Sequence, residues 1–399
     1  MKKNISTTAY LDLLSGALYA FVVFFEVMSL SSWHYLHRGF ESPNSKIVIS
    51  AFCLIILIGF MHQTNLMKML FSLIFLTTAV LYYLHLREVD YFTTLVLALC
   101  AGMSMHFDRI LKIDFLVRTF TVLWIILLSL LHFLPTSGTD SSITGSFFTR
   151  FVYGFSYPNL LGYLIMILAF EFTVVFKKIN VGKIFIILLA FMGAEIFLDY
   201  LTGFLGILVI MIVCIWNRHT GKRRSNSLLI ICLVLIPCLA LISVYVTRAY
   251  NASAPIWFQI NQWMSLRIPI WQYYYQGWGI NFWGSRILVN ARTIGIIGYG
   301  AFDGAYLYFL LRYGVFSLIV IWLTIFSTLF LHNKNEEKVI LAGLLMPIII
   351  TSFPETLGFI NAYSPVFLLI GSAIFATREV TPDELLRRSQ NDVKGKSFL

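Results

Sequence analysis

The chain has 399 residues, of which 59% are hydrophobic and only 12% are charged, and its mean hydropathy is +0.82. This composition excludes an ordinary water-soluble domain, so a lipid bilayer must be the solvent for most of the chain. The formal charge of +10 would suggest nucleic-acid binding in a soluble protein. Here the basic residues fall almost entirely between apolar runs, where they first of all mark membrane topology.

Apolar runs, taken in chain order, predict about twelve transmembrane helices. Many of them approach twenty residues with almost no charge, which is long enough to cross a hydrocarbon core of about 30 Å. The predicted helices lie near residues 10–33, 46–62, 66–86, 91–107, 115–134, 158–176, 183–198, 202–216, 227–248, 304–331, 338–353 and 359–376. The predicted fold class is therefore all-α, with residues 1–399 forming a single polytopic membrane domain.

Two of these predictions depend on local signals. The apolar stretch from Lys183 to Trp216 is too long for one span, and the turn-forming residues 199–203 break it near its middle, so we expect two closely spaced helices. The first predicted helix follows Lys2 and Lys3 and lacks a convincing small-residue cleavage site. We therefore expect it to be retained rather than removed as a signal peptide.

The distribution of basic residues predicts that both termini lie in the cytoplasm. With the N-terminus inside, the outer side receives only nine of the 29 basic residues, and segment 377–399 becomes a basic cytoplasmic tail. The outer basic residues are arginines apart from Lys46. Because a planar guanidinium group suits bidentate capture of phosphate, this bias favours a phosphate-bearing ligand, although contacts with lipid headgroups would also explain it.

One predicted outer loop, residues 249–303, is much longer than the others. It spans 55 residues and is too aromatic for a disordered segment. Five of the nine tryptophans lie in it: Trp257, Trp263, Trp271, Trp278 and Trp283. Aromatic rings stack on the apolar faces of sugars and also lie well at the level of lipid headgroups. The loop therefore fits either glycan handling or burial in the membrane interface.

Motifs of soluble enzymes are absent from the sequence. There is no Gly-rich nucleotide loop, no zinc-binding pair of histidines and no paired acidic motif in an outer loop. We therefore expect neither a metal nor another cofactor. The cysteines lie within apolar runs, where packing explains them better than disulfides or a metal cluster: Cys53, Cys100, Cys214, Cys232 and Cys238.

The first stretch that could carry chemistry is RFVYGFSYPNLLG at residues 150–162. Arg150 precedes a helix start in which Pro158 suits the first turn. Tyr157 and Asn159 flank the positive end of this predicted helix, which faces outward and would be a reasonable seat for an anion. On its own the stretch would be equally well explained as a plain helix start.

Further stretches of this kind follow along the chain. They are DYLTG at 199–203, SLRIPIW at 265–271, FDGAYLY at 302–308 and ETLGFIN at 355–361. In the stretch 265–271, Arg267 lies four residues before Trp271 within the long loop. In the stretch 302–308, helical spacing places Asp303 and Tyr306 on one face, because three residues make nearly one turn.

In this order around one large loop, the stretches resemble the motifs of Wzy-type polysaccharide polymerases, which belong to the O-antigen ligase-like superfamily. The resemblance covers the chain from about Arg150 to the last span. Tyr157 stands where histidine is common in the family, and the turn at 199–203 lacks the arginine of the family's Ser-Arg-Thr-Gly sequence.

The resemblance implies a metal-independent membrane glycosyltransferase at the outer face of the bacterial cytoplasmic membrane. Such an enzyme moves the growing chain from its undecaprenyl diphosphate carrier onto a fresh lipid-linked repeat unit, in the assembly of exopolysaccharide, capsule or O-antigen. The implied partners are the lipid-linked glycans, the bilayer, and the flippase and chain-length regulator of the same pathway. Nucleic acid is not expected.

The predicted site combines carboxylates with arginines and aromatic side chains. Arginines can stabilise the negative charge of a departing diphosphate, and a carboxylate can orient or deprotonate the acceptor hydroxyl. Asp303 and Glu355 are the predicted catalytic carboxylates, with Glu195 as a third candidate, and each would also serve as a simple partner for an arginine. The predicted substrate-binding residues are Arg150, Arg267, Arg286, Arg292, Tyr157, Asn159, Tyr306 and Trp271.

Two other functions stay open at this point. A flippase or transporter would use intramembrane carboxylates such as Glu26, Glu171 and Glu195 as proton relays. However, the two halves of the chain show no convincing repeat, and alternating access does not need the long aromatic loop. A ligase of the same superfamily would use similar motifs to transfer a finished glycan once, so product length would separate it from a polymerase.

Overall fold

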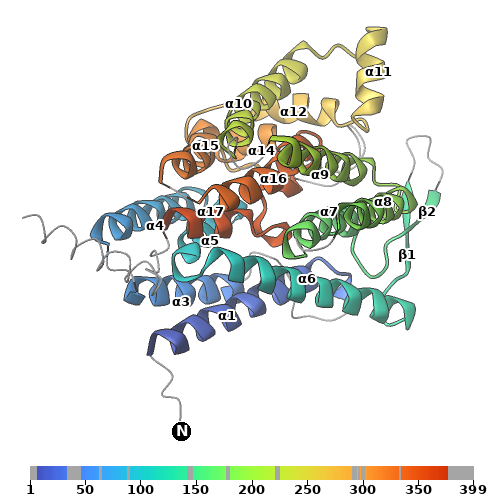
Figure 1. Ribbon diagram of the computed structural model, residues 1–399. Coiled ribbons are helices and arrows are strands. Elements are labelled where there is room, and N and C mark those ends of the chain that lie inside the picture. Colours follow the sequence, from blue (N-terminus) through green and yellow to red (C-terminus); the bar gives the residue numbers. More distant parts are fainter. Residues whose placement is uncertain are drawn as a thin grey trace, which may run out of the picture.

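The computed structural model of the chain is almost entirely helical (Figure 1). It describes residues 7–33, 46–62, 65–87, 90–141, 147–176, 180–220, 225–289, 294, 297, 302–331 and 334–375. The only described sheet is a two-stranded antiparallel hairpin of β1 (Ser137–Ser141) and β2 (Phe147–Phe151), in which Ser137 pairs with Phe151. The predicted all-α class is confirmed.

The helices follow one another along the chain with short connections. They are α1 (Thr7–Ser29), α3 (Lys46–His62), α4 (Leu66–Leu86), α5 (Tyr91–Ala101), η1 (Gly102–Ser104), α6 (Phe107–Leu130), α7 (Pro158–Val175), α8 (Val181–Phe197), α9 (Leu201–Thr220), α10 (Ser225–Ala249), α11 (Pro255–Trp263), α12 (Ile268–Trp278), α14 (Ala305–Arg312), α15 (Gly314–Leu331), α16 (Asn335–Thr351), η3 (Leu357–Phe359), η4 (Asn361–Tyr363) and α17 (Val366–Phe375).

The described helices include six that are long and apolar enough to cross a membrane: α1, α4, α6, α7, α10 and α15. Large apolar side chains on their outer faces are exposed, as in α10, where Leu241 is 70% and Tyr245 is 68% exposed. Exposing so much apolar surface to water would be energetically unfavourable, whereas contact with lipid acyl chains is not. The chain is thus a membrane-embedded protein, and the full number of twelve spans stays a prediction.

Several predicted boundaries were wrong. The predicted helix 304–331 is two helices, because the backbone turns at Gly314, whose φ is 75°. A side chain could not replace this glycine easily, because its Cβ would collide with the backbone of Phe282 and Gly284. The predicted helix 359–376 begins only at Val366, after the two 3-10 turns η3 and η4.

One further prediction is confirmed, and two structural features were not predicted. The predicted break between α8 and α9 is confirmed, and Asp199 adopts a left-handed conformation there with φ of 53°. The predicted loop 249–303 contains the helices α11 and α12, which the sequence analysis did not separate from loop structure. The hairpin of β1 and β2 was not predicted either, and it stands beside the ends of α7 and α8 (Figure 1).

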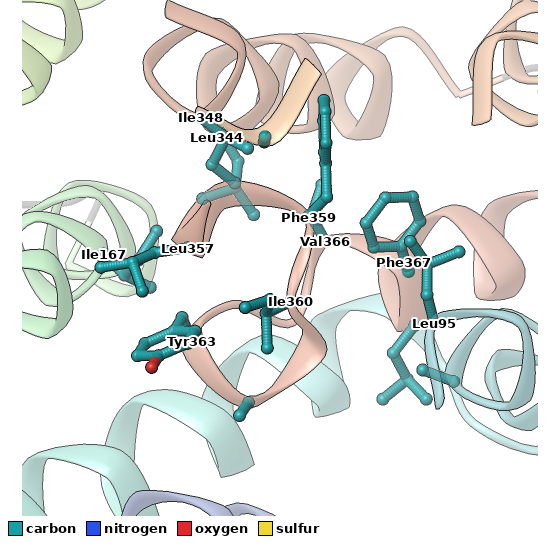
Figure 2. Packing of buried hydrophobic residues seen from close by; sticks show 14 of the residues in the cluster. Leu95, Ile167, Leu344, Ile348, Leu357, Phe359, Ile360, Tyr363, Val366 and Phe367 are labelled. Atoms are coloured by element: carbon teal, nitrogen blue, oxygen red, sulfur yellow. The ribbon is translucent and has the colours of Figure 1, made fainter. Parts of the chain in front are cut away.

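The segment between α16 and α17, residues 352–365, is irregular and yet lies in the core. Its side chains Phe359 and Ile360 pack among α5, α7 and α16 through residues such as Ile167 and Leu344 (Figure 2). Non-helical backbone in a protein interior is tolerated where its polar groups find hydrogen-bond partners. The carbonyl of Ala362 meets this need by accepting a hydrogen bond of 3.0 Å from Arg118 Nη1 of α6.

Helix packing brings separate parts of the chain to one place. The helix α16 packs against α9 and α10, and α7 packs against α6, α8 and α9. The start of α14 is tied to the end of α16, because the backbone N–H of Ala305 donates to the carbonyls of Ser352 and Glu355 at 2.9 and 3.0 Å. The starts of α7 and α14, the α8–α9 turn and the end of α16 therefore surround a common region.

Candidate functional site

Arg267 is placed by an unusual turn between α11 and α12. Ser265 and Leu266 both have left-handed backbone, with φ of 51° and 57°, which non-glycine residues rarely adopt. Asn261, at the end of α11, holds this turn: its carbonyl accepts from the N–H of Leu266 at 2.8 Å, and its Oδ1 accepts from that of Ile268 at 3.2 Å. Such strain is retained where the surrounding structure requires a particular geometry.

The guanidinium group of Arg267 joins three residues. Its Nη1 donates to the carbonyl of Pro354 at 2.6 Å, and its Nη2 lies 3.0 Å from Asp303 Oδ2 and 3.1 Å from Glu355 Oε1. The side chains of Arg267 and Asp303 are 14% and 12% exposed, whereas that of Glu355 is 2% exposed. These three charged side chains form the central cluster of the candidate site.

Asp303 is fixed through its own backbone as well as its side chain. The indole Nε1 of the fully buried Trp271 donates to the carbonyl of Asp303. The next residue, Gly304, has φ of 99°, and a Cβ there would lie 2.8 Å from Trp271 Cε2. Thr356 Oγ1 donates to Asp303 Oδ1 at 3.4 Å. The indole ring therefore needs the glycine, and together they aim the carboxylate of Asp303 at Arg267.

Several opposing effects set the pKa of the Glu355 carboxyl group. Its pKa is raised from 4.5 to about 7 as the net result of burial, which raises it most, the guanidinium of Arg267 and the side chain of Asn159, which lower it, and the carboxylate of Asp303, which raises it. Oε1 contacts Arg267, but Oε2 is buried without a hydrogen bond of ordinary length to any described residue. Glu355 can therefore take up or release a proton close to neutral pH.

The cluster carries more negative than positive charge when both carboxyls are ionised, because two carboxylates meet one guanidinium group. Burial lowers the pKa of Arg267, but Asp303 and Glu355 raise it more, so the guanidinium stays charged. Arg267 is consequently occupied by carboxylates, and an anion could pair with it fully only after one of them is neutralised.

The α8–α9 turn contributes Tyr200 to the same region. Burial raises the pKa of its hydroxyl well above the ordinary value, and the carboxyls of Glu355 and Glu195 and the hydroxyl of Tyr163 raise it further, while Arg267 lowers it. Tyr200 is thus within electrostatic reach of Glu355 and Arg267 and also of Glu195. Tyr200 was not predicted as a site residue, although it lies within the stretch 199–203.

The other predicted site residues fall into two groups. Arg150 lies on β2 and pairs with Asp199 Oδ2 at 2.8 Å, and Tyr157 precedes α7 with 60% exposure, so both lie at the surface near the start of α7. Tyr306 is fully buried, and its hydroxyl donates to the carbonyl of Ile349 at 2.9 Å. This contact holds α14 against α16 and leaves the phenol without an accessible face.

Of the remaining two predicted arginines, the structure describes only Arg286, which is not in the cluster. Arg286 is exposed and follows Ser285, whose N–H donates to the carbonyl of Leu311 near the C-terminal end of α14. Asp303 lies before the opposite end of that helix, so Arg286 and the central cluster are separated by its length. Arg292 lies outside the described residues, as does the predicted tail 377–399.

The described part of the chain holds no group of three His, Cys, Asp or Glu side chains arranged for a metal ion. The arrangement of the central cluster instead suits proton transfer and charge stabilisation: a buried carboxyl near its titration point, a second carboxylate and a partly accessible guanidinium. Comparison with protein-family models, with curated proteins and with solved structures finds no match for this chain.

Proposed function

We propose that the protein is a metal-independent membrane glycosyltransferase that polymerises undecaprenyl-diphosphate-linked repeat units into a surface polysaccharide. In this proposal the chain spans the bacterial cytoplasmic membrane about twelve times, both termini are cytoplasmic, and residues 249–303 lie outside. The observation that carries the proposal is the convergence of the separate sequence stretches. Arg267, Asp303 and Glu355 come from three of them and form the central cluster, while Asn159 and Tyr200, from two others, interact with Glu355 through a hydrogen bond and electrostatically, respectively.

Glu355 is the proposed base. In the transfer, the acceptor hydroxyl gives its proton to Glu355 while its oxygen forms a bond to the anomeric carbon, and the bond from that carbon to the diphosphate oxygen breaks. A base works best when its pKa lies near the working pH, and burial, only partly offset by Arg267, leaves the pKa of Glu355 at about 7. Asp303 is better placed to hold Arg267 and Thr356 than to act as this base, because both of its oxygens are engaged.

Arg267 has two successive roles in this proposal. In the resting site it pairs with Glu355 Oε1 and Asp303 Oδ2. When Glu355 becomes protonated, one of these negative partners is neutralised, and the guanidinium can pair with the charge that develops on the departing diphosphate. An interaction that strengthens only as the reaction proceeds lowers the barrier rather than merely tightening binding.

The surface near the start of α7 is proposed to bind the glycan. Tyr157 is exposed there, and its ring can stack on a sugar face, while Arg150 lies close by on β2 with 32% of its side chain exposed. Asn159 links this surface to Glu355 within the first turn of α7. Arg286, outside this cluster, and Arg292, outside the described residues, stay predicted substrate contacts.

The test is a set of three variants, Arg267→Ala, Arg267→Lys and Glu355→Gln, expressed at membrane levels equal to the wild type. Surface glycan and lipid-linked intermediates are then analysed by gel electrophoresis and mass spectrometry. We expect all three variants to lose long chains and to accumulate carriers that bear a single repeat unit. Lysine should not rescue, because a single ammonium group cannot reproduce the planar fork that joins Pro354, Asp303 and Glu355.

The matched control is Arg248→Ala, which removes an exposed arginine at the end of α10 outside the cluster and should leave chain length unchanged. If the wild type made no ladder of repeats but only a single capping transfer, and the variants lost that transfer, the protein would be a ligase rather than a polymerase. Accumulation of intermediates on the cytoplasmic face would replace it by a flippase. Unchanged glycan in the Arg267 variants would remove this cluster from the site.

A further inference from the structure

Glu195 is a buried carboxyl group that the proposed reaction has not yet used. It lies in the last turn of α8 with no exposed surface. Its carboxyl group fills the space beside two glycines of neighbouring helices: a Cβ at Gly203 would lie 2.5 Å from Glu195 Cδ, and a Cβ at Gly162 would lie 2.6 Å from Oε2. The α7 and α9 backbones thus make room for this one side chain.

Neither oxygen of Glu195 has a hydrogen-bond partner among the described residues, and no basic side chain there pairs with it. An ionised carboxylate without a partner is very costly inside a protein, so such a group takes up a proton instead. This differs from Asp303 and Glu355, which share the positive charge of Arg267. The geometry therefore favours a neutral, protonated Glu195.

Tyr200 contacts Glu195 through its backbone and lies within electrostatic reach of the central cluster. Its N–H donates to the carbonyl of Glu195 at 3.0 Å, and its ring and the Glu195 carboxyl both lie against the position of Gly162. Its hydroxyl is buried without a hydrogen-bond partner among the described residues and lies within electrostatic reach of both Glu195 and Glu355. Buried hydroxyls are nearly always hydrogen-bonded, so this one has capacity for a transient partner or a bridging water.

We propose that Glu195 stores a proton as a neutral acid, gives it to the departing diphosphate through the hydroxyl of Tyr200, and is then protonated again from Glu355 by the same route. The site would then contain a base, Glu355, and a proton donor, Glu195, with the hydroxyl of Tyr200 carrying protons between them. The storage of the proton follows from the burial of Glu195 alone, whereas its use in glycosyl transfer rests on the proposed function.

The proton balance of the transfer closes in this arrangement. Glu355 takes the proton of the acceptor hydroxyl as the bond to the anomeric carbon forms and the electron pair of the broken bond leaves on the diphosphate. Tyr200 passes the proton stored on Glu195 to the departing diphosphate oxygen. The proton on Glu355 then returns through the same phenol to Glu195. Each cycle moves one proton from the acceptor to the diphosphate and restores both carboxyls.

The first experiment tests proton storage without any assay of activity. Infrared spectra of the purified full-length protein in lipid at neutral pH should show the C=O stretch of a protonated carboxyl that disappears in Glu195→Gln and remains in Tyr200→Phe. Glu171→Gln is the matched control, because Glu171 is another fully buried carboxyl of a spanning helix, and its loss should leave the Glu195 band in place. A spectrum in which Glu195→Gln removes no protonated band at neutral pH would overturn the proposal.

The second experiment tests exchange during turnover. Glu195→Gln and Tyr200→Phe should each lower the kcat of repeat addition by about tenfold to a hundredfold while leaving the KM for the lipid-linked donor nearly unchanged, because proton transfer rather than binding is impaired. Glu195→Asp should recover part of the rate. If the wild type adds no repeats, the proposed function fails and the infrared result still decides proton storage. If the wild type adds repeats and both variants match its kcat, the exchange fails.

Discussion

Two arginines in this protein each meet a carboxylate, and they differ in what remains accessible. The side chain of Arg118 on α6 is 1% exposed. Its Nε lies 2.6 Å from Asp114 Oδ1, and its Nη2 donates to Asp114 Oδ2 at 3.0 Å. Its Nη1 donates to the carbonyl of Ala362. The hydroxyl of Tyr19 also donates to Asp114. Arg267 has similar partners, yet 14% of its side chain is exposed and the second oxygen of Glu355 is unengaged among the described residues.

The contrast separates a structural ion pair from a site that can react. At Arg118 the guanidinium, the carboxylate of Asp114 and the nearby carboxyl of Glu171 are all buried, and the contact with Ala362 positions the irregular segment that leads into α17. At Arg267 the two carboxylates outnumber the guanidinium, so a change in protonation alters what Arg267 can bind. The difference is therefore one of access: charges that are fully enclosed stabilise the fold, whereas charges that are partly exposed can also interact with a ligand.

The largest effect is expected when the structural pair is broken. Arg118→Ala leaves the carboxylate of Asp114 buried without its cation and frees the carbonyl of Ala362, so we expect the loss of about 3–5 kcal/mol of stability. Thermal unfolding in detergent and the yield of folded protein in the membrane measure this loss.

A double variant sharpens the same prediction. Replacing both charges, with Arg118→Met and Asp114→Asn, removes the uncompensated carboxylate and should recover much of the stability lost in Arg118→Ala. Equal stability of Arg118→Ala and the wild type would show that this pair does not hold the irregular segment.

The second largest effect is expected at Glu355. Glu355→Gln keeps the shape of the side chain but cannot accept a proton, so repeat addition should fall by about a hundredfold to ten-thousandfold while unfolding temperature changes little. A rate assay with a short lipid-linked acceptor, run beside thermal unfolding, separates the two quantities. A variant that keeps the wild-type rate would exclude Glu355 as the base.

Asp303 is expected to set the pH range of the reaction. Its carboxylate raises the pKa of Glu355, so Asp303→Asn should lower that pKa and move the acid limb of the pH–rate profile to lower pH. The profile is measured from the rate of repeat addition at saturating substrate. A shift to higher pH would mean that the loss of Asp303 acts through structure rather than charge.

The smallest effect is expected at Asn159. Its side chain lowers the pKa of Glu355, so Asn159→Ala should move the acid limb in the opposite direction, to higher pH. Comparison with Asp303→Asn in one assay gives the sign of both shifts. Shifts in the same direction would contradict the electrostatic description of the cluster.

The sequence predicted the helical membrane class and most helix positions because length and apolar composition determine them locally. Arg267, Asp303 and Glu355 were also predicted, each within a motif, but their meeting depends on how α12, α14 and α16 pack, which no local pattern encodes. The breaks at Gly314 and before Val366 were missed because apolar composition continues through them.

The structural pair at Arg118 was missed for a related reason. The predicted helix began at residue 115, so Asp114 fell outside it and the spacing of four residues to Arg118 was not used. That spacing places the two side chains on one helix face, where their charges offset each other within an otherwise apolar run. Tyr200 could have been found only from its neighbours in space, since a tyrosine near a helix start is common.

The central claim is that Glu355 is a base whose charge is set by burial and by Arg267. The most direct measurement is the pH–rate profile of repeat addition by the wild-type protein, beside that of Glu355→Gln. The account predicts that the wild-type rate falls to half near pH of about 7 as Glu355 is protonated, and that this limb is absent from the residual rate of Glu355→Gln. An acid limb that persists unchanged in Glu355→Gln would contradict it.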